Sequence, residues 1–487
     1  MIKVLLINPP NTIPSDSMRR IGEPLGLLYI GTTLKQLGIT VTIFDMACEG
    51  YDNCVINGKF LTYGSSSETL LQKLQSQQPN LIGISCMFTS RESDVFRVCQ
   101  TIRQFSSRIP IVIGGLHATQ HPERFLEPGY ADYVIFGEGE KRLHQLINCL
   151  ENNRLPDFDG VAYQDKGSLK INPMTTRIDI LDSLPYPDRT LIDFDRYQEI
   201  NIPFAPFAAE ERVGHILVTR GCPYLCNFCS SSKFWGRKIR ARSVANVIGE
   251  MRELIDTFGV REIQFVDDNF TAKKKFAKEL LTEMRKLNIR FCTPNGLFVN
   301  SLDSELIKLM AEAGAYQLTF NIESASERVL NKIIQKPVIL SRVKPLVEEA
   351  HKYDISVHGV FIVGFIGETK EEILSTLNFP FSVGFDSVSF FIATPLPGSK
   401  FYQECKDKGY LIENWDHLNF KSVNMNIPSD SIDYCMSSDE LEHLVDSKTR
   451  EYNQWAREKF PERYSRKFSR FLKRHPSKSN LVSGRVT

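Results

Sequence analysis

The sequence lacks a net charge, a long apolar run and a low-complexity tract. Its 487 residues carry 59 lysines and arginines against 58 aspartates and glutamates, which leaves a net charge of +1. No global field therefore concentrates nucleic acid or an anionic membrane, and any anionic partner must be recognised locally. The apolar runs are too short for a membrane span of roughly 18–20 residues or for a secretory signal. We expect a soluble, cytoplasmic protein with no membrane partner, and nucleic acid is a disfavoured partner.

Cysteine, by contrast, is plentiful. The chain has 11 cysteines, many for a reducing compartment, and the odd number argues against a complete set of disulfides. Three of them, Cys222, Cys226 and Cys229, are grouped in one short segment and need a chemical explanation. The others are scattered, and scattered cysteines usually behave as small buried hydrophobes. These eight expected core residues are Cys48, Cys54, Cys86, Cys99, Cys149, Cys292, Cys405 and Cys435.

The pattern of apolar runs predicts an α/β protein. Over residues 1–150, short apolar strands alternate with helix-like stretches, which is typical of a doubly wound parallel sheet. Residues 151–210 are richer in Pro, Asp and Arg and are expected to form a linker segment with a small hairpin. Ligands of doubly wound sheets bind beyond the carboxyl ends of the strands. The loops expected there are 8–10, 85–87, 114–119 and 137–140.

A second series of strands and helices begins near His215. Six βα units fit within 211–410, too few residues for a complete eightfold barrel, so we predict an incomplete (β/α)6 barrel. Residues 411–487 are expected to form a C-terminal, mainly helical and basic region. For its basic stretch, residues 466–475, a solvated helix face is the preferred interpretation, with an RNA arm or a dock for an acidic electron donor as alternatives.

The grouped cysteines follow a predicted strand in the pattern C-x-x-x-C-x-x-C. Structural zinc normally has four ligands, and no fourth Cys or His lies at a suitable spacing nearby. A cubane iron–sulfur cluster held by three thiolates leaves one iron open for chemistry, which suits grouped thiolates in a reducing compartment. A zinc site completed from a distance and three buried cysteines are the alternatives.

This motif, with Phe228 as the aromatic residue before the last cysteine, resembles that of the radical S-adenosylmethionine enzymes. The resemblance covers about 213–400 and implies that Cys222, Cys226 and Cys229 hold a [4Fe–4S] cluster. It also implies that S-adenosylmethionine binds the open iron and, after one-electron reduction, gives a 5′-deoxyadenosyl radical. An electron donor such as flavodoxin or ferredoxin is then required.

The same resemblance assigns residues to S-adenosylmethionine. Polar residues ending the second barrel strand would contact its amino group, and two residues ending the fourth strand its ribose. A glycine after the fifth strand would let the adenine approach the backbone. Helix caps or solvated acids are the alternative interpretation. The residues concerned are Asp267, Asp268, Asn269, Glu323, Ser324 and Gly364.

The N-terminal domain has no G-x-G-x-x-G opening its first helix, which disfavours a dinucleotide site. Together with the cluster motif, it resembles the cobalamin-binding domain fused to many radical S-adenosylmethionine enzymes. The first-strand loop, 8–12, has no histidine to ligate cobalt, and His117 lies on a later loop, so a protein axial ligand is not expected. The residues that the resemblance assigns to cobalamin are Ser85, Met87, Gly114, Gly115, His117, Thr119, Gly137, Glu138 and Gly139.

The two resemblances together imply a cobalamin-dependent radical C-methyltransferase that uses methylcobalamin to methylate an unactivated carbon of a small molecule. Residues 49–64, 233–243 and 265–271 are similar to those of phosphonate methylases in antibiotic biosynthesis, whose substrate is nucleotidylated. The basic segment 233–243, with Arg237, Lys238, Arg240 and Arg242, is either solvated or in contact with carboxylate or phosphate.

Three alternatives remain. The same cofactors could drive ring closure or oxidation without methyl transfer. A tRNA methylthiotransferase would share the cysteine motif but needs three more N-terminal cysteine ligands and a terminal RNA-binding barrel. A cobalamin sensor without catalysis would not need the motif.

Overall fold

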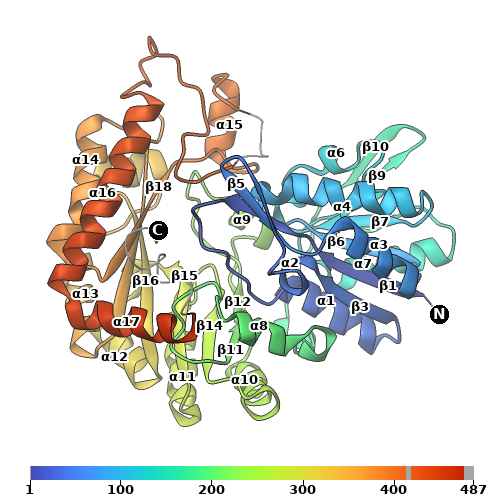
Figure 1. The fold of residues 1–487 in the computed structure, drawn as a ribbon, viewed down its shortest axis with the longest axis horizontal. Coiled ribbons are helices and arrows are strands. Elements are labelled where there is room, and N and C mark those ends of the chain that lie inside the picture. The colour runs from blue at the N-terminus through green and yellow to red at the C-terminus, as the bar shows by residue number, and fades with distance from the viewer. Residues whose placement is uncertain (1, 413–417, 476–487) are drawn as a thin grey trace.

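The computed structural model describes residues 2–412 and 418–475, which form two sheet-based units lying side by side. In Figure 1 the N-terminal unit occupies the blue half and the second unit the green-to-orange half. The arrangement agrees with the predicted α/β class: a doubly wound sheet, an incomplete barrel and a helical C-terminal region. No helix in the described ranges is long and apolar enough to cross a membrane.

The first sheet has seven strands in the order β10-β9-β8-β7-β6-β1-β3. Five of these strands, β8, β7, β6, β1 and β3, pair in parallel. The chain adds β3 on one side of β1 and β6 to β8 on the other, and this change of direction between β1 and β6 creates the switch point where doubly wound sheets bind ligands. The bounds are β1 (Lys3–Asn8), β3 (Thr40–Asp45), β6 (Leu81–Ser85), β7 (Ile111–Gly114), β8 (Tyr133–Ile135), β9 (Val161–Asp165) and β10 (Ser168–Asn172).

Helices cover both faces of this sheet because its strands are apolar on both sides. On one face α1 (Leu25–Gln36) and α7 (Gly139–Glu151) pack through Leu28, Leu34 and Leu146. On the other face lie α3 (Ser67–Gln77), α4 (Glu92–Phe105), α5 (Leu116–Gln120) and α6 (Pro122–Phe125).

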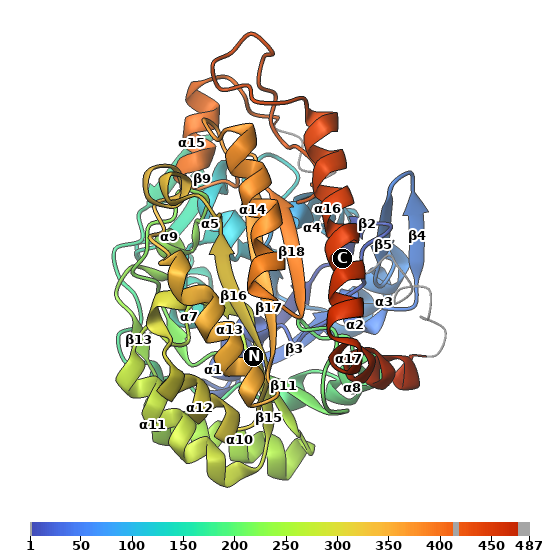
Figure 2. The ribbon, with the colours of Figure 1, turned by 90° about the vertical axis from the view of Figure 1, so that its left-hand side faces the viewer.

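The second sheet is a curved, six-stranded parallel sheet in sequential order, the incomplete barrel that the sequence predicted. Its strands are β11 (Val213–Ile216), β14 (Glu262–Phe265), β15 (Arg290–Leu297), β16 (Ala315–Glu323), β17 (Ser356–Val363) and β18 (Ser387–Ile392). Its outer face is covered, as Figure 2 shows, by α10 (Val244–Phe258), α11 (Lys274–Met284), α12 (Ser304–Glu312), α13 (Val343–Lys352) and α14 (Lys370–Val383).

The segment between the units does more than connect them. β9 and β10 form a hairpin that extends the first sheet past residue 150, so the sheet does not end where the boundary was expected. Further on, Arg189 is almost fully buried and bridges both units: its guanidinium lies 2.8 Å from Glu23 and 2.6 Å from Glu250 of α10. It also donates to the carbonyl of His215 in β11.

The C-terminal region packs on the open side of the barrel. It contains α15 (Lys400–Asp407), α16 (Ser438–Lys459) and α17 (Pro461–Arg474), and α16 lies along β18. Helix α17 has the solvated basic face that was preferred for this stretch, since Arg466, Arg470 and Lys473 are exposed. Its other face is packed: Phe471 is buried in an apolar cluster with Met18 and Tyr197, and Arg474 donates to the carbonyls of 208 and 209. The rest of the predicted basic tail, 476–487, lies outside the described residues.

Two local features differ from the expectation. A small antiparallel sheet of β2 (Asn11–Pro14), β4 (Cys54–Asn57) and β5 (Phe60–Tyr63) was not predicted, because β4 is solvent-exposed throughout and shows no burial pattern. Of the eight cysteines expected in the core, six are buried, but Cys54 is exposed on β4 and Cys435 is only half-buried.

Candidate functional site

The cysteine loop lies beyond the carboxyl end of β11 and is held by backbone hydrogen bonds. The amide of Cys222 donates to Gly236, and Asn227 exchanges backbone hydrogen bonds with Ile334 and Phe401, each within 3.1 Å. Gly221 begins the loop with φ +107, and a Cβ there would lie 2.3 Å from the carbonyl of Lys238. Only glycine fits such a position. The loop conformation is therefore set by the protein itself.

Solvent reaches the three cysteine residues, but the protein around them partly desolvates their thiols. Desolvation raises the pKa of Cys226 to about 11 and that of Cys229 to about 12, and neighbouring thiols raise both further. Lys336, which the sequence analysis did not single out, opposes this effect at Cys226. In the absence of metal the thiols are protonated, so binding of metal must release protons.

The donor set fits a cluster better than a single ion. Within the described residues, no three or more His, Cys, Asp or Glu side chains lie close enough together to hold one metal ion. The ligands of a cubane bind different irons and stand farther apart than those of one zinc ion. Cys222, Cys226 and Cys229 share one loop and influence one another's titration, as three ligands of one cluster would. They are the residues that would hold the [4Fe–4S] group.

The three polar residues 267–269 after β14 make different contacts. Both carboxylate oxygens of Asp267 accept from backbone amides, those of Val218 and Thr219, and one also accepts from the Thr219 hydroxyl. This carboxylate holds the chain before the cysteine loop, and the contact of Asp267 with S-adenosylmethionine stays a prediction. Asp268 accepts from the Ser231 hydroxyl next to Cys229. The buried amide oxygen of Asn269 has no partner within the described residues and can receive a ligand donor.

The end of β16 carries the second predicted group. Glu323 has φ +70, uncommon for a non-glycine residue, and lies at a register shift of the strand. It forms a buried ion pair of 2.6 Å with Lys336, the lysine that also influences Cys226. Ser324 instead turns away from the site, because its hydroxyl contacts Thr376 at 3.1 Å and accepts from the amide of Ser326. The ribose contact of Ser324 stays a prediction.

The glycine motif after β17 is shaped by a buried acid. Gly364 has φ +84, and its amide donates at 2.7 Å to Glu368, which also accepts from Phe365. Burial raises the pKa of Glu368 to about 8, and its second oxygen has no partner in the described part of the chain. The motif thus presents a tight turn with one unused polar atom beside the cysteine loop, since Phe365 packs near Phe228.

The loops assigned to cobalamin gather at the carboxyl edge of the first sheet. Ser85 and Met87 are half-buried at the end of β6, beside the switch point, and the neighbouring Gly114 has room for a ligand. Thr119 ties two loops together: it donates to the carbonyl of Gly115 and accepts from the amide of Gly137. The remaining glycines are required by close packing, since a Cβ on Gly139 would lie 2.8 Å from Ile30. This small-residue edge fits a large flat cofactor.

The ring of His117 is fully buried, and the structure removes it from the cofactor edge. Nδ1 contacts the Thr89 hydroxyl at 3.1 Å and Nε2 contacts Glu92 at 2.8 Å, while Arg124 also pairs with Glu92. Both ring nitrogens bind protein partners, so the contact of His117 with the cofactor stays a prediction that its side-chain bonds do not favour.

We expect the cob(II)alamin form of this protein to lack a protein histidine ligand to cobalt. The reason is that the loop after β1 holds no histidine and that both nitrogens of His117 are hydrogen-bonded inside the protein. Electron paramagnetic resonance of the reduced, cobalamin-loaded enzyme tests this, with ¹⁵N-histidine labelling as the control. Nitrogen splitting that changes with the label would contradict the prediction.

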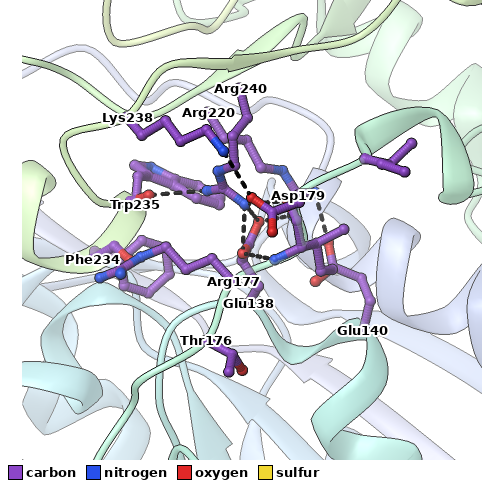
Figure 3. A network of polar contacts seen from close by, with 12 residues as sticks. Glu138, Glu140, Thr176, Arg177, Asp179, Arg220, Phe234, Trp235, Lys238 and Arg240 are labelled. Carbon is purple, nitrogen blue, oxygen red and sulfur yellow. Dashed lines mark hydrogen bonds and ion pairs between the residues drawn. The ribbon is translucent and has the colours of Figure 1, made fainter.

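Glu138 forms the centre of a buried network between the two units (Figure 3). Its carboxylate pairs with Arg220 at 2.7 Å and Arg240 at 2.8 Å, and accepts from the amide of Ile178. Arg220 also pairs with Glu140 at 2.6 Å. Glu138 is therefore not a cobalamin contact through its side chain; it fixes the loop after β8 to the chain that enters the cysteine loop.

The same network shows which groups the basic segment 233–243 contacts. Arg240 and Arg242 are buried and bind protein carboxylates, those of Glu138 and of Glu250 respectively. Lys238 forms an exposed pair of 3.2 Å with Asp179. Of the four cations singled out, Arg237 is exposed on the surface. The carboxylates that Arg240 and Arg242 contact belong to the protein, so these two arginines are not available to a substrate.

A cavity of about 430 Å³ occupies the interior of the open barrel. It reaches Phe228 and Glu323 at the cysteine loop, and polar side chains from four strands line it: Asn295, Thr319, His358 and Ser389. The cavity was not predicted from the sequence. Its signal is the alternation of polar and apolar residues in β16, β17 and β18, which turns polar side chains inward.

Comparison with known proteins agrees with the two units. Residues 216–379 match the radical SAM superfamily and residues 14–147 match the B12 binding domain. Cytidylyl-2-hydroxyethylphosphonate methyltransferase of Streptomyces wedmorensis is 32% identical over 93% of this chain and 90% of its own. Anaerobic magnesium-protoporphyrin IX monomethyl ester cyclase of Rubrivivax gelatinosus is 25% identical over 89% of this chain and 74% of its own.

A solved structure shares the whole fold. The cobalamin-dependent S-adenosylmethionine radical enzyme OxsB, with aqua-cobalamin bound, superimposes with a TM-score of 0.70 at 15% identity. The match covers 99% of this chain and 75% of that one. At this identity the likeness extends to the fold, including the relative placement of sheet and barrel.

Proposed function

This chain belongs to the cobalamin-dependent radical S-adenosylmethionine methyltransferases, and we propose that it methylates an unactivated carbon of a small molecule held in the barrel cavity. Its cofactors are a [4Fe–4S] cluster, S-adenosylmethionine and cobalamin. When bound, these groups supply the radical that removes a substrate hydrogen atom and the methyl group that replaces it.

One observation carries the proposal: the barrel cavity opens onto the cysteine loop at Phe228 and Glu323. A substrate in the cavity therefore lies beside the place where the radical forms. Contacts between the units bring the first sheet's loops to the same place, since the ring of His121 meets that of Tyr402, in α15 beyond β18, at 5.5 Å. The side chains of the protein thus orient substrate, radical source and methyl donor.

The roles of individual residues follow from this arrangement. Cys222, Cys226 and Cys229 ligate the cluster, and Asp268, Asn269, Glu323 and Gly364 hold S-adenosylmethionine beside it. Ser85, Met87, Gly114, Gly115, Thr119, Gly137 and Gly139 form the cobalamin edge. Flavodoxin or ferredoxin supplies the electrons. Asp267, Ser324, His117 and Glu138 are positioning residues.

A nucleotidylated phosphonate is the first substrate to test, because the relative from Streptomyces wedmorensis is named for one. The enzyme is reconstituted anaerobically with iron, sulfide and hydroxocobalamin and given S-adenosylmethionine with a deuterated methyl group, an electron donor and cytidylyl-2-hydroxyethylphosphonate. We expect a product that gains one methylene and keeps the label, seen by mass spectrometry.

The same assay separates the alternatives. Ring closure or oxidation would give a product that loses hydrogen and carries no label, and that outcome would overturn the proposal. The tRNA methylthiotransferase hypothesis finds no support in the described residues: the N-terminal cysteines Cys48, Cys86 and Cys99 are buried in packed apolar clusters, and the C-terminal region is helical.

A further inference from the structure

Arg20 projects from the N-terminal unit into the barrel cavity. Its backbone is pinned on both sides: the carbonyl of Arg20 accepts from the Tyr63 hydroxyl at 2.6 Å, and the amide of Ile21 donates to the carbonyl of Ile202 at 2.9 Å. The guanidinium is left among the residues lining the cavity and donates only a long hydrogen bond, of 3.3 Å, to the carbonyl of Phe204. The position of this cation is therefore set by the fold.

Arg20 is short of negative charge. No carboxylate pairs with it in the described ranges, and although solvent reaches its side chain, the surrounding protein lowers the pKa of its guanidinium. Arg20 therefore has no ion-pair partner among the residues that the structure describes. An anion bound in the cavity would supply the counter-charge that this cation lacks.

The carboxylates of the cavity do not supply that anion. Glu323 is paired with Lys336 at 2.6 Å, and Asp386 is shared by His351 and Arg463. Arg457 also lines the cavity and donates to the Tyr464 hydroxyl at 2.9 Å. The lining thus has more cations than anions. Its aromatic residues, among them Phe204 and Tyr464, offer flat surfaces to a ring.

We propose that this cavity binds a substrate of nucleotide size through a phosphate or phosphonate group, with Arg20 as the main contact and Arg457 as a supporting cation. The inference deepens the proposed function, on which it rests, by naming the class of substrate. A cavity of about 430 Å³ is within the range of small-ligand sites, and the arginine fork is suited to phosphorus oxyanions. It also moves the anion contact away from the basic segment 233–243, whose buried arginines bind the protein.

The test measures binding without turnover. Isothermal titration of the reconstituted enzyme, loaded with cluster, cobalamin and S-adenosylmethionine, is performed with cytidine 5′-monophosphate and with uncharged cytidine. We expect the monophosphate to bind at least about tenfold more tightly than cytidine, and Arg20→Gln to remove most of that difference. Arg237→Gln, which removes an exposed arginine of the basic segment, is the matched control and should bind as the native protein does.

Several outcomes would overturn the proposal. One is that cytidine 5′-monophosphate and cytidine bind equally well or not at all. Another is that Arg237→Gln, and not Arg20→Gln, removes the difference in affinity between the two probes. Loss of bound cobalamin from the Arg20 variant would assign Arg20 to the phosphate of that cofactor. Because Arg20 has no counter-charge to lose, its variant should unfold at the same temperature or higher, and a lower temperature would mark it as structural. Arg457→Gln provides a second variant, with a smaller effect expected.

Binding that depends on Arg20, together with no methylated product, would contradict only the proposed function. Methylation of a substrate without phosphorus, by an enzyme that ignores cytidine 5′-monophosphate, would contradict only the present inference. The two proposals therefore fail separately.

Discussion

Cys226→Ala is expected to abolish formation of 5′-deoxyadenosine, reducing it by about three orders of magnitude or more. The loop supplies three thiolates, and with two the cluster loses both its stability and the single open iron. Iron and sulfide content, the visible absorbance of the reconstituted protein and the rate of S-adenosylmethionine cleavage measure the effect together. No other residue of the site can replace the ligand, because the nearest acids, Asp268 and Glu323, are engaged by Ser231 and Lys336.

Cys54→Ala is the matched control. Cys54 is also accessible to solvent, but it lies on β4 in the small antiparallel sheet, away from the cysteine loop. This variant should keep iron, absorbance and activity unchanged. If Cys226→Ala retained a full cluster, the ligand assignment would be wrong.

Glu138→Ala is expected to give the largest loss of stability, about 3–5 kcal/mol, because it leaves buried cations without their partner. Arg220 would keep only Glu140, and Arg240 only carbonyl oxygens such as that of Ile178. Denaturant unfolding followed by two independent probes measures the loss. Asp179→Ala, which breaks the exposed pair with Lys238 in the same region, should change little.

A second measurement separates positioning from mere stability. Glu138→Gln keeps the size of the side chain and removes its charge. If Glu138 sets the spacing of the two cofactor loops, this variant should form more 5′-deoxyadenosine per methylated product than the native enzyme does, because the radical and the methyl donor are no longer held in register. An unchanged ratio, in a variant that is folded and loaded with both cofactors, would reduce Glu138 to a structural role.

The sequence predicted the features that depend on local pattern. The parallel strands are continuous apolar runs, and the cysteine motif is a matter of spacing, so both were visible without coordinates. What could not be predicted depends on partners far apart in the chain. His117 and Glu138 lie on the expected loops, but Glu92 and Arg240 respectively decide where their side chains point.

The same reasoning applies to residues that were missed. Lys336 lies in an irregular segment with no motif, and only the fold brings it to Glu323 and the cysteine loop. Arg20 lies in a connecting stretch, and nothing near it in the sequence marks it as different from Arg19. The cavity that it enters is formed by four barrel strands, residues 204–207 and two C-terminal helices. Such sites exist only after the chain has folded.

The buried position of Arg189, between Glu23 of the first unit and Glu250 of the second, has a consequence for recombination. Domain shuffling normally works where few contacts cross a boundary. Here an exchange of either half with a relative would leave the guanidinium or a carboxylate buried without its partner, unless the relative also has residues equivalent to Glu23, Arg189 and Glu250. We therefore expect functional chimeras of this enzyme only when the exchanged part keeps all three charged residues compatible, so that the two halves and the connecting segment evolve together.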